Sequence, residues 1–122
     1  MNDEQKNKLD FAEEKLSTAR LLLENGKFED SVSRAYYGMF HAAKALLIEK
    51  DSRPKTHSGT VSELGKLYRE ELGVELSREF SRIQEKRERA DYGEIKDLNK
   101  KDTQRIIETA EEFVKKAKNI LD

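Results

Sequence analysis

The chain has 122 residues, of which 40% are charged and 35% hydrophobic, and its formal net charge is −1. This length fits one domain over residues 1–122, and the near-neutral balance argues against a protein that coats nucleic acid by charge alone. The absence of cysteine excludes disulfide scaffolds, zinc knuckles and thiol chemistry. We see no apolar run of membrane-spanning length and no signal peptide, and therefore expect a cytoplasmic protein without a membrane partner.

The first half of the chain has the apolar period of two long helices, over residues 3–24 and 28–49. The second of these is apolar or small on several sides from Ala35 to Ile48, which indicates a central helix. Gly38 lies in its middle, where glycine costs about 1 kcal/mol relative to alanine. A close helix crossing or a ligand against the backbone would explain that glycine, and the crossing is the commoner reason. The stripe expected to face the core in residues 3–24 is Leu9, Ala12, Leu16, Ala19 and Leu23.

The second half predicts helices over residues 58–70 and 75–91 and a last helix that begins near Asn99, a suitable N-cap. Arg87 is unusual because it lies on an otherwise apolar stripe. The stripe of residues 75–91 is Leu76, Phe80, Ile83, Arg87 and Ala90, and that of the last helix is Ile106, Ala110, Phe113, Ala117 and Ile120. The fold class predicted is all-α, an up-and-down bundle of about five helices.

Three blocks, taken together, resemble the HEPN domain family, in its small stand-alone archaeal and bacterial branch. They are residues 33–47, residues 54–59 and residues 87–93, in the family's order. The resemblance implies a helical bundle, a homodimer, and a minimal nucleotidyltransferase as partner in a toxin–antitoxin pair. It also implies a nucleotide or RNA as ligand. Active members are metal-independent endoribonucleases that use an Arg and a His four to six residues apart, near the end of the helix that matches residues 75–91.

The sequence departs from this catalytic pair. When Arg87 is aligned with the family's Arg, the expected His falls at Tyr92, with Asp91 before it. One interpretation is an ion-pair and hydrogen-bond cluster of Arg87, Asp91 and Tyr92, in the core or at an interface, because buried charges usually exist paired. The other is a rebuilt catalytic site, in which Arg87 or Arg89 supplies the cation and His57 or His41 arrives from another helix or from a second subunit. Tyr92 is a poor base at neutral pH, since the usual pKa of tyrosine is about 10.

A second candidate site lies where the helix over residues 58–70 begins. Free N–H groups at a helix N-terminus attract anions, and the residues there could bind a phosphate of a nucleotide or RNA. The alternative is simple capping by Thr56 or Ser58, with His57 bonded to the bundle. The four residues of this candidate phosphate site are Lys55, Thr56, His57 and Ser58.

Other polar and aromatic residues have two interpretations each. Tyr36 and Tyr37 could stack on a base, although their bulk is more often core, and His41 fits a core or interface histidine. Arg34 and His41 match the catalytic spacing but lie on the wrong helix for the family's pair. A basic stripe could follow a phosphate backbone, although interleaved glutamates favour an ordinary salt-bridged surface, and a dimer contact is a third reading. The stripe is Arg78, Arg82, Lys86 and Arg89.

The sequence has no Glu-x-x-His pair, Walker loop or dinucleotide fingerprint, so we predict no metal and no cofactor. Three functions remain open. The first is a non-catalytic or weakly active HEPN module that binds a nucleotide, RNA or partner protein in a toxin–antitoxin or defence system. The second is a metal-independent endoribonuclease with an altered site made of Arg87, Asp91, Tyr92 and His57. The third is a structural adaptor for a nucleotidyltransferase.

Overall fold

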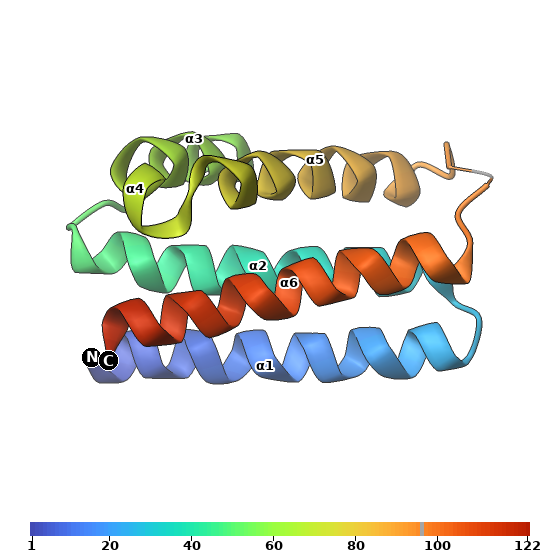
Figure 1. Ribbon diagram of the computed structural model, residues 1–122, viewed down its shortest axis with the longest axis horizontal. Helices are drawn as coiled ribbons and strands as arrows, with labels where there is room; N and C mark the ends of the chain where they lie inside the picture. The colour runs from blue at the N-terminus through green and yellow to red at the C-terminus, as the bar shows by residue number, and fades with distance from the viewer. Residues whose placement is uncertain (96) are drawn as a thin grey trace.

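The computed structural model describes residues 1–95 and 97–122, and within these residues it contains six helices and no strand (Figure 1). The bounds are α1 Asp3–Glu24, α2 Phe28–Glu49, α3 His57–Leu67, α4 Arg69–Leu72, α5 Val74–Asp91 and α6 Lys100–Leu121. Three helices, α1, α2 and α6, have 22 residues each, and three shorter helices lie between α2 and α6 in the chain. The prediction of an all-α bundle is confirmed. None of the described helices is both long enough and apolar enough to cross a membrane.

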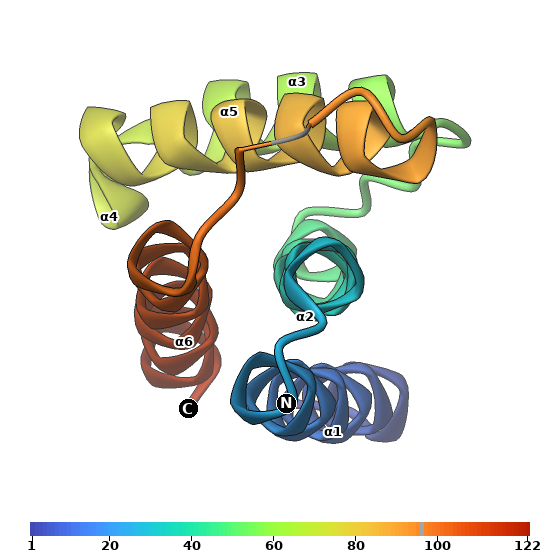
Figure 2. The ribbon, with the colours of Figure 1, turned by 90° about the vertical axis from the view of Figure 1, so that its right-hand side faces the viewer.

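Helix α2 is the centre of the bundle, as its apolar sequence predicts. Figure 2 shows it between α1 on one side and the layer of α3 and α5 on the other, with α6 alongside. Twelve of its residues are buried, from Ser31 to Ile48. Because α2 touches four other helices, side chains that leave it on different sides meet residues from α1, α3, α5 and α6.

The predicted apolar stripes lie in the core. The five residues of the α1 stripe are all buried, and so are those of the α6 stripe except Ile120, which is half-buried beside a buried Leu121. A Cβ atom on Gly38 would lie 2.8 Å from Leu16 Cδ2 and 3.2 Å from the carbonyl oxygen of Ala12. The close crossing of α1 and α2 therefore explains the glycine.

The bundle has six helices where the sequence predicted about five, because the segment predicted over residues 58–70 divides at Tyr68. The backbone of Tyr68 leaves helical geometry, with φ −123° and ψ 21°. Its ring is buried, and its hydroxyl donates to the carbonyl oxygen of Leu46 at 2.6 Å. A short α4 follows and ends at Gly73, whose φ of +88° is readily adopted only by glycine.

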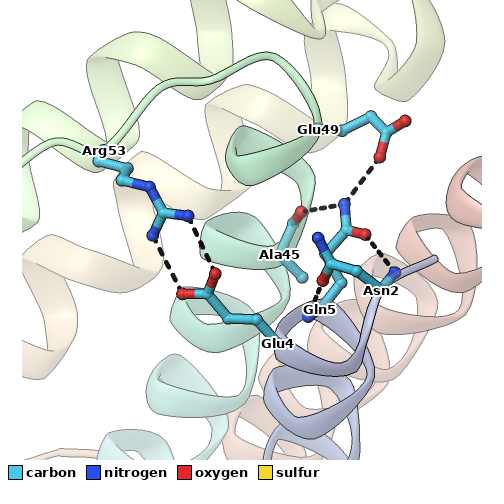
Figure 3. A network of polar contacts seen from close by, with 6 residues as sticks. All are labelled: Asn2, Glu4, Gln5, Ala45, Glu49 and Arg53. Carbon is cyan, nitrogen blue, oxygen red and sulfur yellow. Dashed lines mark hydrogen bonds and ion pairs between the residues drawn. The ribbon is translucent and has the colours of Figure 1, made fainter.

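The start of α1 is bonded to the end of α2 and to the loop that follows it (Figure 3). Asn2 and Gln5 form a capping box, and the buried Gln5 amide donates to Ala45 O at 3.3 Å and Glu49 Oε1 at 2.8 Å. Arg53 donates two hydrogen bonds to Glu4, at 3.0 and 2.9 Å. These bonds hold the loop that leads into α3, which begins with His57.

Candidate functional site

Arg87 lies on the core-facing side of α5, as its place in the apolar stripe predicts. Its side chain is 13% exposed, and its Cζ atom lies 4.9 Å from the centre of the Tyr36 ring and 5.7 Å from that of Tyr37. A guanidinium over tyrosine rings is a favourable cation–π arrangement. The two rings of α2 therefore explain how an arginine is accommodated in an apolar stripe.

The polar contacts of this guanidinium are uneven. Nη1 donates to Asp91 Oδ2 at 3.0 Å, whereas Nη2 is 4.0 Å from Glu88 Oε1, beyond hydrogen-bond distance. Nε is buried and has no hydrogen-bond partner among the described residues. A buried donor without a partner costs about 1–3 kcal/mol. Among the described residues Ser77 Oγ is in the same state, so the unpaired Nε does not by itself define a site.

His57 approaches the same place from α3. The distance between its Nδ1 and the hydroxyl oxygen of Tyr36 is 2.7 Å, and its ring stacks on Phe40 with centroids 4.3 Å apart. Burial lowers the pKa of His57 below its usual value, and the nearby charge of Arg87 lowers it further. The imidazole is therefore neutral at physiological pH, and its Nε2 can accept a proton in the tautomer whose Nδ1–H donates to the Tyr36 hydroxyl oxygen.

Tyr36 is the point at which these groups meet. It is fully buried, its hydroxyl bonds His57, and its ring carries Arg87, which in turn is held by Asp91. Burial raises the pKa of Tyr36, so its hydroxyl stays protonated. We call Tyr36, His57, Arg87 and Asp91 the Tyr36 cluster. It combines a fixed neutral imidazole with a fixed guanidinium, the pair of groups that acid–base chemistry at a phosphate needs.

Three of the four residues predicted as catalytic therefore come together, and Tyr92 does not join them. Tyr92 is the C-cap of α5 and its side chain is 80% exposed. The hydrogen bonds and ring contacts of the described residues connect it to no member of the Tyr36 cluster.

The candidate phosphate site at the start of α3 has a different arrangement. Thr56 is the N-cap and accepts from the backbone N–H of Gly59 at 2.9 Å, with Ser58 Oγ 3.4 Å from the Thr56 hydroxyl. His57 bonds Tyr36, and Lys55 is exposed. Thr56 therefore caps α3, as the alternative interpretation predicted. A phosphate role for these four residues stays a prediction.

The basic stripe of α5 is partly paired with its own glutamates. Arg82 binds Glu79 and lies 3.8 Å from Glu75, and Arg78 lies 3.6 Å from Glu75. These contacts match the ordinary salt-bridged surface that the interleaved glutamates favour. Among the described residues, no three His, Asp or Glu side chains lie close enough together to hold a metal ion.

The sequence left Tyr36 open between core packing and stacking on a base, and it predicted no functional role for Phe40 or Lys44. Lys44 Nζ donates to the carbonyl oxygen of Pro54 at 3.0 Å, which helps to hold the loop before His57. No spacing within α2 predicts that Tyr36 would face both α3 and α5. The only available signal was the unusual Arg87, since a buried cation needs aromatic or acidic neighbours.

Comparison with known proteins identifies the family. The family model described as HEPN domain matches residues 7–120, so the chain belongs to the HEPN family. Among its relatives, a "UPF0332 protein" of Archaeoglobus fulgidus is 39% identical over 98% of this chain and 97% of its own length. A protein of Methanocaldococcus jannaschii named "Putative toxin MJ0605" is 38% identical over 93% of this chain and 85% of its own length.

A third relative matches more closely over a shorter part. The "UPF0332 protein PH1297" of Pyrococcus horikoshii is 62% identical over 55 residues, which are 45% of this chain and 39% of that relative. The matched part thus spans about two fifths of the P. horikoshii protein. The resemblance of residues 33–47, 54–59 and 87–93 to the stand-alone HEPN branch is confirmed by these matches.

Proposed function

We propose that this HEPN protein binds an RNA or nucleotide phosphate at the Tyr36 cluster, as a non-catalytic or weakly active member of a toxin–antitoxin pair. The observation that carries the proposal is the convergence of Arg87 and His57 on one buried tyrosine, Tyr36. Arginine is suited to phosphate because its donors form a planar fork. The relative named "Putative toxin MJ0605" supports the biological setting.

The phosphate would reach Arg87 from the side of Asp91. The Asp91 side chain is 42% exposed and that of Arg87 is 13% exposed, so in this proposal the phosphate replaces the Asp91 carboxylate at Nη1 and approaches from the Asp91 side. A phosphate there competes with the Asp91 carboxylate for Nη1 and is repelled by its charge. In this proposal the Asp91 carboxylate occupies the phosphate position while no ligand is bound. Removing its charge should therefore strengthen phosphate binding.

A second candidate function is metal-independent RNA cleavage, favoured by the neutral state of His57. In this reaction His57 takes the proton of a ribose 2′-hydroxyl, whose oxygen attacks the adjacent phosphorus. Arg87 stabilises the charge on the phosphoryl oxygens, and the bond to the 5′ oxygen breaks as that oxygen takes a proton from water. The products carry a 2′,3′-cyclic phosphate and a 5′-hydroxyl.

The experiment measures binding and cleavage of a fluorescent single-stranded RNA in EDTA. The variants are Arg87→Met, which keeps the packing on the tyrosine rings, His57→Gln and Asp91→Asn. Arg82→Met is the matched control, because Arg82 lies on the same helix but is half exposed and paired with Glu79. We expect Arg87→Met to lose binding about tenfold or more, Asp91→Asn to gain it, and the control to change little.

Three results separate the alternatives. Cleavage that both Arg87→Met and His57→Gln abolish would make the protein an endoribonuclease. Binding without cleavage, lost in Arg87→Met, would support the binding module. If folded wild-type protein binds and cleaves no RNA or nucleotide, both are wrong and the structural adaptor remains.

We also propose that the protein acts as a homodimer with a minimal nucleotidyltransferase partner, as the family resemblance implies. Co-expression with a nucleotidyltransferase encoded beside it, followed by size-exclusion chromatography with light scattering, tests this. A stable complex that contains two copies of this chain is expected. Separate elution of a monomer would contradict the proposal.

A further inference from the structure

The outer face of α1 and α2 carries a continuous row of cations and rings beside the Tyr36 cluster. On α2, steps of three, four and three residues place four side chains along one side of the helix, none of them fully buried. On α1, three side chains with the same spacing lie next to them. We call these residues the α1–α2 track: Arg34, Tyr37, His41 and Lys44 of α2, and Lys8, Phe11 and Lys15 of α1.

Ring contacts connect the two helices within the track. The Phe11 ring, whose residue is 40% exposed, meets His41 edge-on with centroids 4.6 Å apart, and Lys15 Nζ lies 4.6 Å from the centre of the Phe11 ring. An exposed aromatic ring flanked by ammonium groups matches the needs of a nucleobase and its phosphate together.

The charge of the track is positive. Burial lowers the pKa of His41 to about 4, and the ammonium groups of Lys8, Lys15 and Lys44 lower it further. The carboxylate of Glu4 near one end already accepts two hydrogen bonds from Arg53. At the opposite end Asp30 lines the depression beside Arg34, about three turns from His41 along α2.

The α1–α2 track includes a surface depression, and one of its residues lies next to members of the Tyr36 cluster. Near Arg34 and Tyr37 a depression of about 430 Å³ is lined by Thr18, Leu22, Asp30, Ser33, Arg34 and Tyr37. The ring of Tyr37 lies 5.4 Å from that of Tyr36 and 5.7 Å from Arg87 Cζ. Tyr37 is therefore shared by the track and the site.

We propose that the α1–α2 track binds single-stranded RNA and leads it to the Tyr36 cluster. Lys8, Lys15 and Lys44 contact phosphates, and Phe11 and Tyr37 stack on bases. This inference rests on the proposed function, since the strand it binds is the one whose phosphate reaches Arg87. A second copy of the chain is a poorer occupant, because a symmetric contact centred here would bring the same lysines of both copies together.

The test compares a dinucleotide with an RNA of about 12 nucleotides, within the range that single-strand binding folds cover. Fluorescence anisotropy is recorded between about 50 and 200 mM salt for wild type, for a Lys8→Gln, Lys15→Gln double variant and for Phe11→Ala. The matched control is Lys100→Gln with Lys101→Gln, which removes the same charge from two exposed lysines at the start of α6.

We expect the double variant to reduce the salt dependence, the slope of log K against log salt, by about 1.4 for the longer RNA, at about 0.7 per lost phosphate contact. Phe11→Ala should weaken the longer RNA about fivefold or more, the loss of one stacked base. Binding of the dinucleotide should stay at the wild-type level in both. The Lys100 and Lys101 control should leave the slope for the longer RNA near that of wild type.

The outcomes distinguish this inference from the proposed function. If the longer RNA binds the double variant as it binds the control, while Arg87→Met still abolishes dinucleotide binding, the track is wrong and the site stands. If wild type binds neither RNA, both are wrong. If the double variant binds RNA normally but changes the oligomeric state in light scattering, the face belongs to a second copy and the inference is overturned.

Discussion

Two buried tyrosines, Tyr36 and Tyr68, make the same kinds of contact with different partners. Both rings lie in the core, both carry a cation over one face, and both hydroxyls make one short hydrogen bond. Tyr68 donates to the Leu46 carbonyl oxygen at the end of α2, where the Lys50 amide bonds Leu47 instead of Leu46. Tyr68 thus completes a helix end, which is a structural task.

The hydroxyl of Tyr36 bonds a titratable side chain, His57, and its cation is a mostly buried arginine whose Nε has no partner among the described residues. The cation over Tyr68 is Lys50, which is 36% exposed and lies 3.6 Å from Glu71. Buried polar groups that serve stability have hydrogen-bond partners within the protein, whereas those at a binding site often keep a donor or an acceptor without a partner. This difference supports the proposal that the Tyr36 cluster is a binding site.

The largest expected effect comes from removing a core ring that packs against Tyr36. Phe80 is fully buried, with its ring 5.8 Å from that of Tyr36 and 5.3 Å from that of Phe113. We expect Phe80→Ala to lower the free energy of unfolding by about 3–5 kcal/mol, the usual cost of a large cavity in a core. Urea denaturation followed by circular dichroism measures it.

Phe11→Ala is the control for that loss, because the Phe11 ring is 40% exposed. Its cost should stay below about 1 kcal/mol. A similar small loss in Phe80→Ala would mean that Tyr36 is not held by core packing, and the comparison with Tyr68 would fail.

The sequence was sufficient to predict the long helices, because their apolar stripes repeat over several turns. The α1 and α2 bounds follow from that periodicity, and the mid-helix Gly38 indicated a close crossing or a ligand, of which the structure has the crossing. The break at Tyr68 does not, since it depends on a hydroxyl reaching Leu46, a residue 22 positions away. Local periodicity carries no information about such a contact.

The sequence predicted most residues of the candidate site, but it did not predict how they are placed relative to one another. Arg87 stood out as a charge in an apolar stripe, and His57 and Asp91 followed from the family pattern. Tyr36, which joins them, looks like ordinary core in the sequence because its role depends on α3 and α5 facing the same side of α2. Tyr92 aligns with the family's catalytic position yet faces solvent, because α5 ends at Asp91.

The pH dependence of stability sharpens the comparison, because the rings of both histidines lie next to that of Phe40, a neighbour of Tyr36. Burial and neighbouring lysines lower the pKa of His41 from about 6.5 to about 4. Between these values the unfolded chain binds a proton that the folded chain does not, so stability is full above pH 6.5 and falls as the pH drops toward 4. Because His41 is only half-buried and solvent screens the neighbouring charges, the loss attributable to it is about 1–2 kcal/mol.

Thermal unfolding of wild type and of His41→Gln between pH 4 and pH 7.5 tests this sign. The variant has no imidazole to protonate, so its Tm should fall less than that of wild type on acidification. His57→Gln should change the profile in the same direction, since the pKa of His57 is also lowered. Parallel curves for wild type and His41→Gln would show that His41 titrates normally.

The smallest expected change in stability comes from removing either tyrosine hydroxyl, which tests the roles of the two hydroxyls directly. Tyr68→Phe removes the donor to a buried carbonyl, and we expect it to lower the free energy of unfolding by about 1–2 kcal/mol without changing RNA binding. Tyr36→Phe should cost less stability, about 0.5–1.5 kcal/mol, because the half-buried His57 can bond water instead. It should weaken RNA binding, however, because the His57 ring loses the bond that fixes it. Equal RNA binding by the two variants would place both hydroxyls in the same structural role.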